Sequence, residues 1–225
     1  ARYNMPSVPV VNEQGRLLGR VTFDDVIDVV EAETTEDLLK FGGVSPDEGL
    51  GAGWKTAVQS RLPWLSVNLA TAFLAGGVVF LFQHTIQRTV ALAIWMPIIA
   101  GMGGNAGTQA LAVTVRRLAL GLIPVNVFTQ VVGKEILVGI INGLVMGLTV
   151  GAVATFIGEG PRLGIVVFLA MVGNLMVAGF AGAFIPIVLE RMGIDPAVAS
   201  SIFVTTFTDV CGFLLLLGLA GAILL

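Results

Sequence analysis

Five long apolar segments dominate the larger part of this chain of 225 residues. They lie at about residues 62–82, 90–115, 135–157, 163–189 and 196–224. A helix needs about 20 residues to cross the hydrocarbon core of a bilayer, where every backbone polar group must be bonded within the protein. The sequence therefore predicts an all-α membrane protein with five transmembrane helices per subunit.

The composition fits membrane helices and excludes several other classes of protein. Apolar residues make up 56% of the chain and charged residues 12%, whereas soluble chains average about 25% charged residues. The 29 glycines suit close packing of helices in a bilayer. We expect membrane lipid as a partner and no nucleic acid. The sequence has no zinc-protease, Walker or nucleophile-elbow motif, so we do not expect an enzyme.

The first 53 residues form an acidic arm, with ten acidic and four basic side chains. Two short runs of β-forming residues surround a turn at residues 12–15, and Thr22 is a good N-cap for a helix that follows. A second short helix is expected to open at Thr34. The predicted division is residues 1–33 for the end of a soluble α/β domain, 34–61 for a connecting helix and linker, and 62–225 for the membrane part. The chain begins with Ala1 rather than Met, and we expect it to be a piece of a longer protein.

Basic residues beside the apolar segments predict the orientation. If the acidic arm lies on the inner side, six of the eight basic residues after residue 53 also lie there. Cytoplasmic loops carry an excess of Lys and Arg. We therefore predict a multi-pass protein of the cell (inner) membrane, with a cytoplasmic N-terminus and an extracellular C-terminus.

Asp209 lies about 13 residues into the last apolar segment, at a depth where a charge is costly. Thr205 and Ser201 precede it at four-residue intervals, so the three side chains share one face of a helix. Ionisable groups in a membrane span usually line ion paths, and this face is our candidate cation pathway. The alternative is a protonated aspartate that hydrogen-bonds a neighbouring helix.

The second apolar segment contains a glycine-rich stretch at residues 97–109. Pro97 removes a backbone donor, and Asn105, Thr108 and Gln109 add polar groups at mid-depth. Exposed carbonyl and amide oxygens suit a hard cation or its water shell. Helix packing through the GxxxG motif would explain the glycines alone. The remaining amides within the spans are interpreted as interhelical hydrogen-bonding groups: Asn68, Asn142 and Asn174.

These motifs resemble the MgtE family of magnesium channels, and the match covers nearly all of the chain. The glycine-rich stretch resembles the family's second-span motif, and Asp195-Pro196-Ala197 and Thr208-Asp209-Val210 resemble its last-span motifs. Residues 9–26 look like the end of a CBS domain, and residues 36–40 resemble the family's connecting "plug" helix.

The resemblance implies a homodimeric channel for hydrated Mg²⁺, with a pore lined by the second and fifth spans. Mn²⁺, Co²⁺, Ni²⁺ and Ca²⁺ are the competing ions. The implied ion site comprises Asp209, Thr205 and Ser201 of the last span with Gly101, Gly104 and Thr108 of the second, beside Asn105. Family members can carry Asn where this chain has Thr108 and Ser201, and a small apolar residue where it has Thr205.

In the family, cytoplasmic Mg²⁺ closes the pore by binding acidic side chains. The residues that resemble these regulatory positions are Asp25, Asp28, Glu33, Glu36, Asp37 and Asp195. Clustered acids repel one another, and a divalent ion relieves that repulsion. Two alternatives to a channel remain open from the sequence: a proton- or sodium-coupled divalent cation exchanger, and a membrane scaffold that transports nothing.

Overall fold

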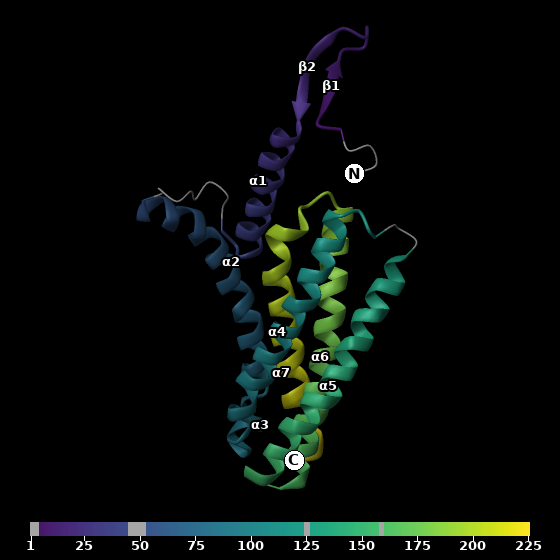
Figure 1. Ribbon diagram of the computed structural model, residues 1–225. Coiled ribbons are helices and arrows are strands. Elements are labelled where there is room, and N and C mark those ends of the chain that lie inside the picture. The colour runs from purple at the N-terminus through teal and green to yellow at the C-terminus, as the bar shows by residue number, and fades with distance from the viewer. Residues whose placement is uncertain (1–4, 45–52, 124–126, 158–159) are drawn as a thin grey trace. The chain divides into compact units, whose positions relative to one another are not determined.

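The computed structural model describes residues 5–44, 53–123, 127–157 and 160–225. The chain divides into two compact units, Ala1–Ser60 and Arg61–Leu225 (Figure 1). The first contains a β-hairpin and a helix, and the second is a bundle of helices.

The first unit confirms the predicted hairpin and the helix cap. Strands β1 (Ser7–Val11) and β2 (Leu17–Thr22) pair antiparallel, and helix α1 (Phe23–Phe41) follows directly. Thr22 caps α1, because its backbone is in the β region and its hydroxyl oxygen accepts from the Asp25 N–H in the first turn. The separate helix expected at Thr34 is not formed, because α1 continues through this residue. The Thr34 hydroxyl donates to the Val30 carbonyl at 2.6 Å, which satisfies it inside the helix.

Each predicted apolar segment lies on one long helix of the structure. These helices are α2 (Trp54–Leu81), α4 (Leu92–Ala119), α5 (Phe128–Ile157), α6 (Pro161–Arg191) and α7 (Pro196–Ile223). A short helix, α3 (Gln83–Arg88), fills part of the break expected after the first segment. Within the described residues, four helices are long and apolar enough to cross a membrane: α2, α5, α6 and α7. Helix α4 is as long as α2 and α7, but its proline, glycines and amides make it less apolar.

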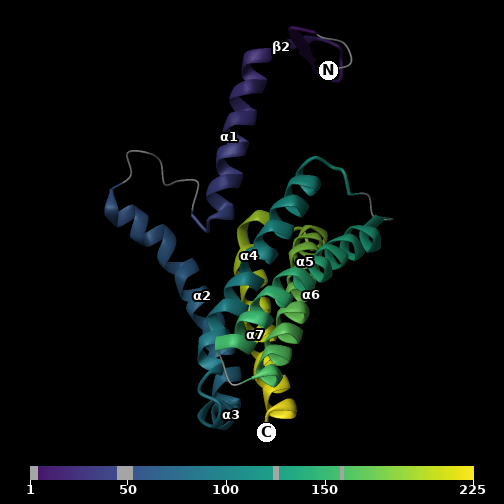
Figure 2. The same ribbon diagram turned by 60° about the horizontal axis from the view of Figure 1, so that its bottom comes forward.

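Helix α6 is the centre of the bundle, because α4, α5 and α7 all pack against it (Figure 2). Its buried side chains include Val166, Met171 and Leu175. Helix α5 approaches α6 through glycines at four-residue intervals, at positions 139, 143, 147 and 151. A Cβ atom at Gly143 would lie 2.9 Å from the Val172 Cα atom, so the two backbones nearly touch. Helix α4 and helix α7 pack against one another as well as against α6.

Candidate functional site

The contact between α4 and α7 brings together residues from both predicted motifs. A Cβ atom built at Gly104 of α4 would lie 3.8 Å from the Thr205 methyl group of α7. At Gly107, a Cβ atom would lie 2.5 Å from Val204 and 3.6 Å from Thr208. The missing side chains on α4 therefore let α7 approach closely. This contact places the glycine-rich stretch beside the face that carries Thr205.

The threonine hydroxyls at this contact donate to their own helices. Thr108 donates to the Gly104 carbonyl at 2.8 Å, and Thr205 donates to the Ser201 carbonyl at 2.9 Å. Thr208 donates to the Thr205 carbonyl at 2.9 Å. The hydroxyl hydrogens are used in this way, but the half-buried Thr108 and Thr205 keep oxygen lone pairs that can accept from water, whereas Thr208 is fully buried. These groups therefore suit a hydrated cation better than they suit an anion.

Asp209 is half-buried on α7, one turn beyond Thr205. Within the described residues, no hydrogen-bond donor or basic side chain contacts its carboxylate. A carboxylate among membrane helices is costly unless a counter-charge or water reaches it. The chain itself supplies no such counter-charge in the part that the structure describes. Asp209 is thus available to a cation that comes from outside the subunit.

The remaining pore candidates surround this contact less closely. Ser201 is half-buried on α7, and its carbonyl accepts the Thr205 hydroxyl. Gly101 is exposed, with open space where a Cβ atom would stand. Asn105 lies elsewhere, because it lines a cavity of about 210 Å³ between α4 and α5, together with Gln109 and Asn142. The structure therefore groups Asn105 with other amides rather than with Thr205.

Of the three amides predicted to bond between helices, Asn174 does so. Its Nδ2 atom donates to the carbonyl of Ile99 on α4 at 2.8 Å. Asn142 and Asn68 are exposed, and their side chains make no hydrogen bond to the described residues. The prediction is confirmed for Asn174 and stays a prediction for the other two.

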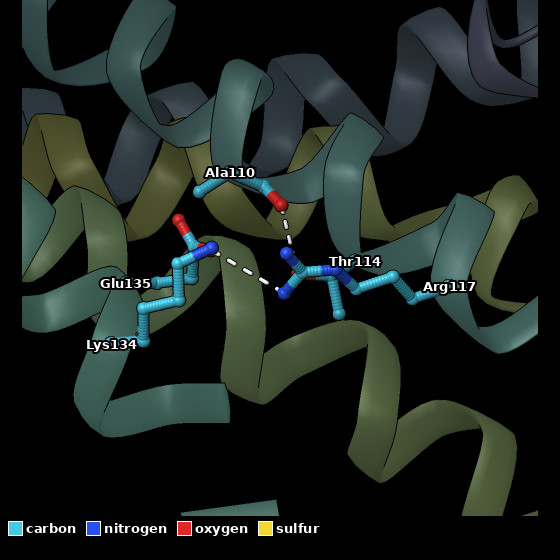
Figure 3. Close-up of polar contacts among 5 residues, drawn as sticks. All are labelled: Ala110, Thr114, Arg117, Lys134 and Glu135. Atoms are coloured by element: carbon cyan, nitrogen blue, oxygen red, sulfur yellow. Dashed lines mark hydrogen bonds and ion pairs between the residues drawn. The ribbon is translucent and has the colours of Figure 1, made fainter. Parts of the chain in front are cut away.

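Glu135 is a buried carboxylate that the sequence pattern did not reveal. It is 7% exposed, and its Oε1 atom lies 3.8 Å from Arg117 Nη1 and 3.9 Å from Lys134 Nζ (Figure 3). Because the third apolar run begins at residue 135, the sequence places Glu135 at a segment end. The structure begins α5 at Phe128, two turns earlier. One signal was available, since Glu135 continues the four-residue spacing of the α5 glycines.

The predicted regulatory acids of the arm all belong to α1, where they have different local contacts. Asp25 Oδ2 accepts from the Thr22 backbone N–H and the Thr22 hydroxyl, each at 2.7 Å. These bonds, the backbone one first, hold the pKa of the Asp25 carboxyl below its usual value. Asp28 is exposed, and it lines a groove along α1 together with Glu31 and Glu36.

Among the other predicted regulatory acids whose side chains the structure describes, Glu36 lines that groove and the rest do not. Glu36 forms an ion pair with Lys40 one turn later on α1. Glu33 is exposed and does not line the groove. The Asp37 side chain lies outside the described residues. In the second unit, Asp195 is the N-cap of α7, where its Oδ1 atom accepts from the Ala197 N–H at 2.9 Å. No group of three acidic, histidine or cysteine side chains forms a metal cluster among the residues that the structure describes.

Comparison with known proteins finds the same family across the chain. The MgtE family, described as a divalent cation transporter, matches residues 96–219. The chain is 34% identical to the magnesium transporter MgtE of Bacillus subtilis, over 98% of this chain and 49% of that relative. It is 36% identical to the Enterococcus faecalis protein of the same name, over 97% and 48%. For the Thermus thermophilus protein the identity is 37%, over 100% and 50%. The chain thus spans about half the length of the curated relatives it matches.

Proposed function

Because this chain belongs to the MgtE family of divalent cation transporters, we propose that it forms the conducting part of a magnesium channel. The family consists of transporters, so the expectation that the chain is not an enzyme is confirmed. The proposed substrate is Mg²⁺, which the names of all three relatives give as their cargo. The proposed conduction is passive, driven by the ion gradient and the membrane potential.

The observation that supports this proposal best is the Asp209 carboxylate beside the α4–α7 contact. It has no counter-charge among the described residues, and hydroxyl oxygens of Thr205 and Thr108 lie on the two helices that meet there. Mg²⁺ loses its water reluctantly and prefers octahedral oxygen ligands. We propose that Asp209 neutralises the hydrated ion through its water shell, while hydroxyl and carbonyl oxygens accept from those waters.

The proposed assembly is a homodimer of five-span subunits, in which α4 crosses the membrane in addition to α2, α5, α6 and α7. The exposed stripe of α4, which includes Gly101 and Asn105, supports this assembly. An amide in contact with lipid would lose its hydrogen bonds, so this stripe needs a second subunit or water beside it. Two Asp209 side chains related by a two-fold axis would then balance the charge of one Mg²⁺. We further propose that the acidic arm is cytoplasmic and that the C-terminus lies outside.

We also propose that cytoplasmic Mg²⁺ regulates the channel by binding acidic side chains. The acidic face of α1 that carries Asp28 and Glu31 supports it, because its negative charge attracts a divalent ion, while the third acid of that groove, Glu36, is already paired with Lys40. Asp25 uses its Oδ2 atom in the cap of α1, which leaves its other oxygen for an ion, and Asp195 caps α7 through its Oδ1 atom. Glu33 and Asp37 complete the proposed set. We also propose that the pore selects Mg²⁺ over Mn²⁺, Co²⁺, Ni²⁺ and Ca²⁺, because Asp209 recognises the ion through its water shell.

Ion flux into reconstituted vesicles tests the proposed function. With a Mg²⁺ indicator inside, the parent protein should give Mg²⁺ uptake that does not need a pH or Na⁺ gradient. Asp209→Asn should lower this uptake about a hundredfold, the factor expected if a charge interaction of about 2.5–3.5 kcal/mol is lost. The matched control is Glu190→Gln, which removes an exposed acid at the end of α6 and should leave uptake unchanged.

Three results would contradict the proposal. Uptake that requires a proton or sodium gradient would indicate an exchanger instead. A folded parent without any flux would indicate a scaffold. Full Mg²⁺ conduction by Asp209→Asn would remove Asp209 from the ion pathway.

A further inference from the structure

Asn174 occupies the point where the three central helices of the bundle meet. It lies on α6 and its side chain is fully buried. Its Nδ2 atom donates to the Ile99 carbonyl of α4 across 75 residues of sequence. A buried amide on a membrane helix is stable only where such partners exist, so its placement is specific.

Two glycines make room for the Asn174 amide, one on each proposed pore helix. A Cβ atom at Gly103 of α4 would overlap the amide nitrogen and lie 2.9 Å from its carbon. A Cβ atom at Gly212 of α7 would lie 2.8 Å from the nitrogen and 3.0 Å from the carbon. Real side chains do not approach so closely. The amide of Asn174 is therefore wedged between the backbones of α4 and α7.

The two glycines that the Asn174 amide approaches are close in sequence to residues of the candidate ion site. Gly103 directly precedes Gly104, whose missing side chain admits Thr205. Gly212 follows Asp209 by three residues, which is just under one turn of α7. The amide of Asn174 meets α4 at Gly103 and the Ile99 carbonyl and meets α7 at Gly212, so its effect on the site would act through the two backbones.

The hydrogen bonding of Asn174 is one-sided. Its nitrogen is bonded to α4, whereas its buried Oδ1 atom has no partner among the described residues. Helix α4 is thus bonded to α6, while α7 is held against the same amide by packing alone. The volume of the amide, and not a bond, sets how near α7 comes.

From this geometry we infer that Asn174 is a positioning residue that sets the spacing between α4 and α7, and through it the ion selectivity of the channel. The inference rests on the proposed function of the α4–α7 contact. A site that recognises an ion through its water shell depends on the distance between its walls. Loss of the bond to Ile99 would release α4 and make that distance variable.

The decisive variant is Asn174→Leu, which keeps a side chain of similar size and removes the donor. Vesicle uptake of Mg²⁺ and of Ca²⁺ is measured in parallel, normalised to folded protein. We expect the ratio of Mg²⁺ uptake to Ca²⁺ uptake to fall by about threefold or more. An interhelical hydrogen bond in a membrane favours the packed arrangement by about this factor on average, so its loss should populate other α4–α7 spacings to the same extent. The control Asn68→Leu, which changes an exposed amide on α2, should keep the parental ratio.

A second measurement does not depend on transport. Backbone amide exchange over residues 97–105 should rise by about threefold to tenfold in Asn174→Leu, because α4 loses its bond to α6. If Asn174→Leu does not fold, Asn174→Ser is measured in the same two ways. The pair Gly103→Ala and Gly103→Ala/Asn174→Ala tests the wedge, since the single variant should lower the melting temperature and the double variant should recover part of that loss.

Failure of the inference is distinct from failure of the proposed function. If the parent conducts Mg²⁺ and Asp209→Asn does not, an unchanged ion ratio in Asn174→Leu overturns the inference alone. Equal loss of Mg²⁺ and Ca²⁺ uptake with a lowered melting temperature also overturns it, because that is a purely structural role. If the parent conducts nothing, the proposed function fails, and unchanged amide exchange in the variant would overturn the positioning role independently.

Discussion

Asp209 and Glu135 are both carboxylates on long helices of the same bundle, but their surroundings differ. Glu135 is 7% exposed and has Arg117 and Lys134 within 4 Å. Asp209 is half-buried and has no basic partner in the described part of the chain. A carboxylate in a membrane protein needs a counter-charge. For Glu135 the protein supplies it, so this group joins α4 to α5, whereas for Asp209 the proposed source is a visiting cation.

The largest contrast is expected between Asp209→Asn and Glu135→Gln. The first should abolish most Mg²⁺ uptake without lowering the melting temperature, because it removes a charge that has no partner in the chain. Glu135→Gln should keep most uptake but lower the free energy of unfolding by about 1–3 kcal/mol. This cost is below that of a fully buried pair because Arg117 and Lys134 reach solvent. Vesicle flux and thermal unfolding in detergent measure the two effects.

A Glu135→Gln variant that is folded and stable but conducts no Mg²⁺ would contradict the purely structural role of Glu135. In that case the cavity of about 170 Å³ that Glu135 lines with Gln109 and Asn142 would belong to the ion path. The path would then run between α4 and α5.

A smaller effect tests whether α4 and α7 must touch. Gly107→Ala places a methyl group 2.5 Å from Val204, whose branched side chain cannot turn away easily. We expect unfolding to become easier by about 1–2 kcal/mol. The matched change Gly218→Ala, on α7 with open space around it, should be neutral or slightly stabilising. Equal melting temperatures for the two variants would show that the α4–α7 contact is loose.

A still smaller difference in stability should distinguish the two basic side chains beside Glu135. The Arg117 side chain is 31% exposed and the Lys134 side chain 56%, at nearly equal distances from the carboxylate. Arg117→Gln should therefore destabilise the bundle by about 1 kcal/mol, and Lys134→Gln by less than about 0.5 kcal/mol, since exposed ion pairs contribute little. Unfolding in detergent at low and at high salt measures both. A larger loss for Lys134→Gln would reverse the assignment of Arg117 as the main partner.

Much of the fold follows from local sequence signals. The length of the apolar runs predicts the long helices, and Thr22 with the turn at residues 12–15 predicts the hairpin and the start of α1. In each case the signal is a spacing or a cap within one stretch of chain.

What the sequence did not reveal depends on contacts between distant segments. The burial of Glu135 depends on α5 starting at Phe128, before the apolar run, and on Arg117 of another helix. Three intramembrane amides look alike in the sequence, and only the packing selects Asn174, whose partner is a backbone carbonyl. At Thr34 the local signal was misleading, because a hydroxyl can cap a helix or bond back within one.

The smallest expected effect concerns a third carboxylate, Asp25, whose partners are neutral donors of its own helix end. Its pKa is lowered, first by the Thr22 backbone N–H and then by the Thr22 hydroxyl. A lowered pKa in the folded state means that this cap stabilises α1 fully above the ordinary pKa of aspartate, and that the stabilisation is lost as the pH falls through the lowered value. The protection of the Thr22 amide, measured against its intrinsic exchange rate at the same pH, should therefore fall in acid, and Asp25→Asn should remove that pH dependence. If Mg²⁺ at neutral pH also speeds up this exchange, the ion competes with Thr22 for Asp25, and Asp25 resembles Asp209 rather than Glu135.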